Sequence, residues 1–268
     1  MSDACDHEAT LGAARSRRSA DRARALHDAF VDPHADELLS QMLDESDDLV
    51  FAKPFIAAHL GDLAGDNGDA ALRRAIRVSG PGSRDVRCAS LLALAKRTGA
   101  LATPDLIEGL SVPDAAVKDY AVIGLAGAGD DRAWEQVLRY LRSVLRRKRR
   151  AHGRSQVAYA LAYLARHASD RPRRSELVAF VRGRWDAIDE AEWFALLWPD
   201  AAPDGPHLKA VQAPSGEAIQ AWARESPFQT AGRAFWITGS AADSGNVFAT
   251  VRLGRGPQRG STLNGCST

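Results

Sequence analysis

The sequence contains few aromatic residues, three cysteines and no long uninterrupted apolar segment. Aromatic side chains make up 7% of the 268 residues, which argues against a β-sandwich because strands are enriched in aromatic residues. Cys5, Cys88 and Cys266 are too scattered for a metal cluster, and their odd number fits no complete set of disulfides. A membrane-spanning helix needs about 18 apolar residues in a row, and no segment of the chain approaches this length.

The chain also lacks an excess of charge of either sign. Lys and Arg number 35, Asp and Glu number 34, and the formal net charge is +1, so the overall charge indicates neither a nucleic acid nor a membrane as partner. The two signs are nevertheless segregated. Residues 25–52 contain acids but no Lys or Arg, whereas residues 139–154 contain basic residues but no acid. Such a chain can present two different faces to partners.

The N-terminal residues give no sign of secretion. Residues 1–28 lack the apolar core of a signal peptide. Together with the unpaired cysteines, this predicts a cytoplasmic protein that does not bind membranes.

Apolar periodicity divides the chain into three parts. We expect residues 1–25 to form a poorly ordered polar arm, residues 26–239 to form the folded body, and residues 240–268 to form a flexible tail rich in Gly and Ser. Within the body, apolar residues recur with a period near 3.6, which predicts an all-α fold. The expected N-caps are Ser83, Thr103, Asp114, Asp130 or Asp131, and Asp170, and Gly99 is an expected C-cap.

The glycine-containing residues 120–131 could form a phosphate-binding turn or the end of a packed helix. Residues 85–98 align with residues 116–129 at an offset of 31, which places Gly124 opposite Ala93 of a helical pattern. The dinucleotide fingerprint G-x-G-x-x-G also fails on spacing, and no strand pattern precedes it. We therefore interpret the stretch as one helix of a repeat, with Gly124 at a close helix contact.

The repeating helix pairs resemble HEAT repeats and related armadillo-like arrays. The resemblance is carried by Pro113, Asp114, Val117 and Lys118, with a weaker copy beginning at Ser83. It implies a right-handed α-solenoid of about five helix pairs, whose long curved surface binds a macromolecule. In the family, the acidic and basic residues of this motif brace adjacent repeats.

The acid-free basic segment is the most distinctive local feature. On a helix, Trp134, Val137, Leu138, Leu141 and Leu145 form an apolar stripe, and the arginines project away from it. The candidate partner-binding or phosphate-binding residues are Arg139, Arg142, Arg146, Arg147, Arg149 and Arg150. Three interpretations remain open at this point: a solvated helix face, a surface for an acidic protein, and a phosphate-binding ridge.

A tryptophan-rich segment follows in residues 184–200. Trp185, Asp186 and Asp189 are faintly similar to the site of HEAT-like DNA base glycosylases, which use Trp, Asp and Arg. The alternative is a terminal cap, in which Trp193, Phe194, Leu197 and Trp198 close the apolar core.

No linear motif of this sequence requires catalysis. The histidines show no H-E-x-x-H spacing, and no serine lies in a G-x-S-x-G elbow. His59 and Cys88 lie in apolar patterns typical of packed side chains. We therefore expect a non-catalytic helical-repeat scaffold, without cofactor or metal, that binds a protein partner. The alternative is a nucleic-acid-binding protein that uses residues 139–154.

Overall fold

The described part of the chain is helical. The computed structural model describes residues 2–16, 18–45, 52–80, 82–146, 154–189 and 191–205. Within these ranges the backbone forms α-helices and short 3₁₀ turns, without a strand. The all-α prediction is confirmed for this part of the chain. The expected tail, residues 240–268, and residues 206–239 of the expected body lie outside the described residues.

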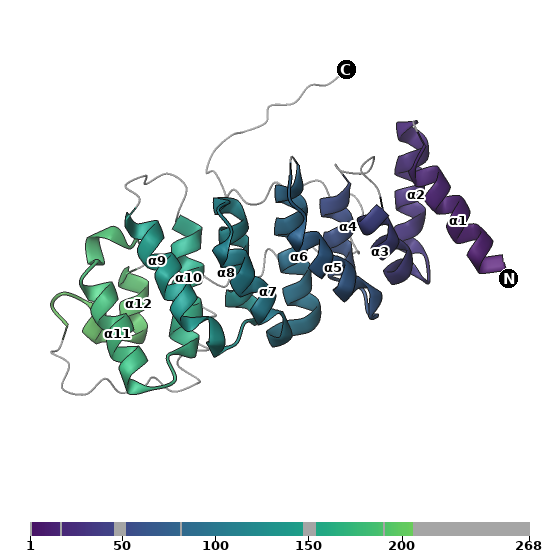
Figure 1. Ribbon diagram of the computed structural model, residues 1–268. Helices are drawn as coiled ribbons and strands as arrows, with labels where there is room; N and C mark the ends of the chain where they lie inside the picture. The colour runs from purple at the N-terminus through teal and green to yellow at the C-terminus, as the bar shows by residue number, and fades with distance from the viewer. Residues whose placement is uncertain are drawn as a thin grey trace, which may run out of the picture.

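The helices follow one another in chain order along one direction (Figure 1). They are α1 (Ser2–Ala14), α2 (Ser19–Val31), α3 (Ala35–Glu45), α4 (Lys53–Leu60), α5 (Asn67–Arg77), α6 (Ser83–Thr98), α7 (Thr103–Ser111), α8 (Ala115–Ala128), α9 (Trp134–Arg146), α10 (Arg154–His167), α11 (Arg171–Arg182) and α12 (Ala191–Leu197).

From α3 to α10, consecutive helices pack as pairs. Helix α3 contacts α4, α5 contacts α6, α7 contacts α8 and α9 contacts α10. Neighbouring pairs contact each other through corresponding helices. The first helices of the pairs, α3, α5, α7 and α9, contact one another in sequence, and so do the second helices, α4, α6, α8 and α10. Each pair therefore buries its apolar faces against the pair before it and the pair after it.

Helices also occupy most of the expected N-terminal arm. Helix α1 packs against α2, and α2 packs against α3. The buried side chains at these contacts are small: Ala14, Ala25 and Ala29 are at most 3% exposed. The expectation of a poorly ordered segment over residues 1–25 rested on its lack of large apolar side chains. Alanine side chains allow helices to pack closely without large apolar residues, which explains why helices form where a poorly ordered arm was expected.

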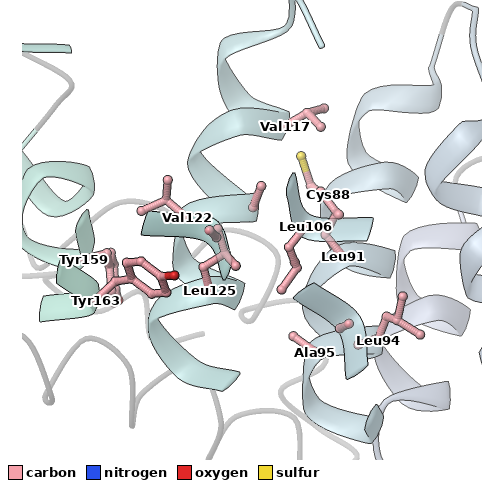
Figure 2. Packing of buried hydrophobic residues seen from close by; sticks show 14 of the residues in the cluster. Cys88, Leu91, Leu94, Ala95, Leu106, Val117, Val122, Leu125, Tyr159 and Tyr163 are labelled. Atoms are coloured by element: carbon pink, nitrogen blue, oxygen red, sulfur yellow. The ribbon is translucent and has the colours of Figure 1, made fainter. Parts of the chain in front are cut away.

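The core is one continuous cluster that extends from Ala14 to Ala201. Figure 2 shows its central part, where Leu91 and Ala95 of α6 face Leu106 of α7 and Leu125 of α8. Cys88 belongs to this cluster and is 5% exposed, so its interpretation as a buried small residue is confirmed.

Several expected helix boundaries agree with the structure. The Asp114 carboxylate caps α8, since its Oδ1 accepts the backbone N–H groups of Ala116 and Val117 at 2.8 and 3.3 Å. Asp170 caps α11 in the same way, and Asp130 caps the short 3₁₀ turn before α9. Helix α6 ends at Gly99, whose φ of +58° lies in the left-handed region that glycine tolerates.

The expected N-caps at Ser83 and Thr103 are wrong. Helix α7 begins at Thr103 itself, and Ala102 is its N-cap residue. Gly82 is the N-cap residue of α6, with a φ of +80°, and the Ser83 hydroxyl donates backwards to the carbonyl oxygen of Gly80 at 2.8 Å. The positive φ of Gly82 allows the chain to turn at the start of α6. Ser83 is therefore the first residue of the helix and not its N-cap.

The stretch 120–131 is the end of a helix, as the repeat predicts. Helix α8 runs through Gly124 to Ala128, and Gly129 is its C-cap. A Cβ atom built on Gly124 would lie 2.7 Å from Leu106 Cδ2 and 3.4 Å from Ala95 Cβ. Gly124 therefore permits α8 to lie close to α6 and α7, and the packing interpretation is confirmed.

Ion pairs between residues 30 to 34 positions apart connect neighbouring helix pairs. Such pairs are Arg15–Glu45, Arg74–Asp44, Arg77–Glu108, Arg84–Asp114 and Arg142–Glu176. Their separations are close to the 31-residue offset of the sequence repeat. Bonds of this spacing are expected when each helix pair is stacked on the one before it.

Candidate functional site

Helix α9 carries the described part of the basic segment. Its apolar side is as predicted, since Trp134, Val137, Leu138 and Leu141 are at most 2% exposed, whereas Leu145 is only partly buried. The Arg173 guanidinium covers the Trp134 ring from α11, 5.2 Å from the ring centroid. The apolar side anchors α9 between its neighbours and leaves the opposite side for the arginines.

The arginines of α9 have two different environments. Arg142 donates to the Glu176 carboxylate on α11 at 2.8 Å, and its guanidinium lies 5.9 Å from the centroid of the Phe180 ring. Arg139 and Arg146 are exposed, and neither has a carboxylate partner within the described residues. Arg147, Arg149 and Arg150 lie outside the described residues. The structure therefore leaves Arg139 and Arg146 available for a partner; we call the surface that bears them the α9 face.

Three of the six described acids of the N-terminal acidic segment are paired with arginines. Asp36 binds Arg97, Asp44 binds Arg74, and Glu45 binds Arg15. The end of this segment, residues 46–50, lies outside the described residues. Because arginines of other helices neutralise these carboxylates, the described part of the segment offers less free negative charge than its composition suggests.

A pocket of about 200 Å³ adjoins the α9 face. Its lining residues come from the end of α7, the beginning of α8, and α9. These helices lie near one another (Figure 1). Leu110, Ala115 and Val144 give it an apolar lining, and the side chains of Lys118 and Arg139 bring positive charge to it. Lys118 has no carboxylate partner within the described residues. The pocket thus combines an apolar interior with two uncommitted cations.

Hydrogen bonds fix the polar side of this pocket. The Tyr140 hydroxyl donates to Asp119 Oδ1 at 2.5 Å, and the Gln156 side-chain amide donates to Asp119 Oδ2 at 3.1 Å. These bonds join α8, α9 and α10. They engage both oxygens of Asp119, so this carboxylate is held by neutral donors next to Lys118.

Sequence reasoning found Arg139 but missed the pocket beside it. Lys118 was expected to brace adjacent repeats together with Asp114. In the structure, Asp114 instead binds Arg84 of the preceding helix pair at 2.8 Å. The other lining residues come from three helices, and no linear motif connects them.

The tryptophan-rich segment lies at the end of the described helices. Phe194, Leu197 and Trp198 are at most 7% exposed, as a terminal cap predicts, whereas Trp193 is 42% exposed. Trp185 is partly buried in a 3₁₀ turn, and the neighbouring Asp186 is exposed. The side chains of Trp185 and Asp186 do not line the pocket described above.

Burial shifts the pKa values of Cys88 and His59 in the direction that opposes ionisation at neutral pH. Burial raises the pKa of the Cys88 thiol to about 12, which makes it a poor nucleophile. Burial also lowers the pKa of His59, whose ring lies 4.5 Å from the Phe30 ring. Both residues behave as packed side chains. Within the described residues, no three His, Cys, Asp or Glu side chains gather as a potential metal site.

None of the helices in the described part of the chain combines the length and apolar composition of a membrane span. Comparison with family models, curated proteins and solved structures gives no match.

Proposed function

We propose that the protein is a right-handed, HEAT-like α-solenoid of about five helix pairs and acts as a non-catalytic scaffold. Two observations support the architecture. Like members of neighbouring helix pairs contact one another from α3 to α10. Arginine–carboxylate pairs also recur at separations near the 31-residue repeat. Stacked repeats produce both patterns, because each pair contacts only its neighbours. A cytoplasmic location stays a prediction from the sequence.

The ligand that we propose is an acidic protein segment bound at the α9 face. The uncommitted charge of Arg139 and Arg146 carries this proposal. Most arginines on the preceding helices already bind carboxylates of this chain, as Arg74, Arg77 and Arg84 do. Guanidinium groups bind carboxylates through paired hydrogen bonds, so an acidic partner supplies the groups that this face lacks.

Nucleic acid is the second candidate for the same face, because residues 139–154 contain no acid. One observation favours a protein. Tyr140 is 8% exposed, so its ring is not free to stack on a base.

Fluorescence anisotropy with a labelled glutamate decapeptide tests the proposal. The double variant Arg139→Gln, Arg146→Gln is expected to bind this peptide about five- to tenfold more weakly than the parent, since each exposed ion pair contributes up to about 1 kcal/mol. The matched control is the double variant Arg24→Gln, Arg171→Gln, which removes two exposed arginines from α2 and α11. The control is expected to bind like the parent.

Two results would contradict the protein-binding proposal. One is equal weakening of peptide binding in both double variants, which would show that binding depends only on the net charge of the protein. The other is tighter binding of a short DNA duplex than of the peptide at about 0.15 M salt, with a log–log salt slope of about −0.9 per phosphate neutralised. That result would assign the face to nucleic acid instead.

A further inference from the structure

The geometry points to the pocket between α7, α8 and α9 as the specificity site of the scaffold: it takes an apolar side chain of a partner peptide while Lys118 and Arg139 bind the acidic residues beside it. This inference rests on the proposed function and adds the chemistry of the segment that is recognised. A purely acidic peptide would use the charges alone, whereas an acidic peptide with one apolar anchor would use the charges and the pocket.

The size and lining of the pocket suit a single side chain. Its volume of about 200 Å³ is smaller than the roughly 300–1,000 Å³ of sites that enclose whole small-molecule ligands. Leu110 and Val144 are only partly buried in the free protein, so an apolar group placed between them would remove further apolar surface from water. Such burial favours binding by about 25 cal/mol per Å².

The charges around the pocket determine what flanks the anchor. Lys118 and Arg139 reach the same pocket from α8 and α9. The Asp119 carboxylate between these helices accepts bonds from Tyr140 and Gln156. Asp119 also lines the pocket, so its carboxylate offsets one of the two positive charges of Lys118 and Arg139. The remaining positive charge favours a carboxylate next to the anchor.

One polar atom in the lining fits a peptide rather than an inorganic anion. The side-chain oxygen of Gln136 is buried without a hydrogen-bond partner within the described residues. A buried acceptor without a partner is unfavourable. After rotation of its terminal amide, Gln136 can accept a backbone N–H of a bound peptide, which a free phosphate or carboxylate lacks.

The test compares two labelled decapeptides on the full chain: oligoglutamate, and the same peptide with one central leucine. The parent is expected to bind the leucine peptide about tenfold more tightly. Ser143 is exposed on α9 and lines the pocket, so Ser143→Trp is expected to fill it. This variant should lose the preference for leucine and retain its affinity for oligoglutamate.

One control separates pocket filling from damage to the fold. Ser169→Trp adds the same ring at an exposed turn after α10 and is expected to keep the tenfold preference. Unchanged helical circular dichroism checks the fold of each variant.

The outcomes distinguish this inference from the proposed function. If the parent binds both peptides equally, the pocket takes no apolar anchor and the inference is overturned, while binding of acidic segments at the α9 face stands. If Ser143→Trp keeps the preference for leucine, the anchor lies elsewhere and the inference is again overturned. If the parent binds neither peptide, both proposals fail.

Discussion

Replacing Arg97 with methionine is expected to lower the free energy of unfolding by about 3–5 kcal/mol. The side chain of Arg97 is 4% exposed and forms ion pairs with Asp36 at 3.0 Å and Asp69 at 2.7 Å. It also donates to the backbone carbonyl oxygens of Leu60 and Leu63. Methionine preserves much of the apolar stem but removes all of these bonds. Asp36, which is 13% exposed, would then be a largely buried charge without its guanidinium.

Arg97 has this importance because it joins two successive helix pairs, α3–α4 and α5–α6. It extends from α6 to Asp36 on α3, to Asp69 on α5 and to the chain after α4. The matched control is Arg74→Met, which removes an arginine that is 59% exposed and bound to Asp44. Its expected cost is at most about 1 kcal/mol, because water screens an exposed pair. Urea unfolding followed by circular dichroism measures both; equal costs would show that Arg97 is no more than a surface residue.

Replacing Gly124 with valine is expected to lower the free energy of unfolding by about 1–3 kcal/mol through overpacking. The new Cβ would stand 2.7 Å from Leu106 Cδ2, and Leu106 is fully buried. The leucine can move only by displacing its own neighbours, among them Ala95 of α6, whose Cβ lies 3.4 Å from the same point. Helix α8 would therefore shift away from both α6 and α7.

Gly12→Val is the control for this substitution. Gly12 lies on α1, and a Cβ atom there meets nothing within 4 Å. A surface change of this kind alters stability by about 0.5 kcal/mol or less. Thermal unfolding of both variants gives the comparison. An unchanged midpoint for Gly124→Val would show that residue 124 is not at a close helix contact.

The local features of the fold could be predicted from the sequence because their causes are local. Asp114 and Asp170 cap helices through their own carboxylates, and this preference is visible in a few consecutive residues. Gly124 was placed correctly because alignment with Ala93 gave it a helical environment. The apolar stripe of α9 was also predictable, since a period of 3.6 residues places its members on one side.

The long-range features could not be predicted in this way. Arg97 binds Asp36 from 61 positions away, and the sequence of α6 does not distinguish this arginine from its neighbours. The pocket is formed by three helices, and its shape depends on how far α7, α8 and α9 lie apart. Helix α2 was missed because its buried residues are mainly alanines, which add little to an apolar pattern.

The availability of the charged side chains of α9 could not be predicted from the sequence either. A run of arginines on one helix indicates a basic surface, but the sequence does not reveal that Arg142 is bound by Glu176 while Arg139 is not. The distinction depends on α11, which packs beside α9 through the Trp134–Arg173 contact. The number of available charges therefore follows from packing and not from composition.

Amide hydrogen exchange of the full chain, with and without the leucine-containing glutamate peptide, is the most direct measurement of binding at the α9 face. Bound peptide is expected to slow exchange in residues 110–120 and 134–146, which contain Lys118, Arg139 and the pocket lining. Exchange in α3 and α5 is expected to stay unchanged. Slowed exchange confined to other helices, or equal slowing along the whole chain, would contradict binding at this face.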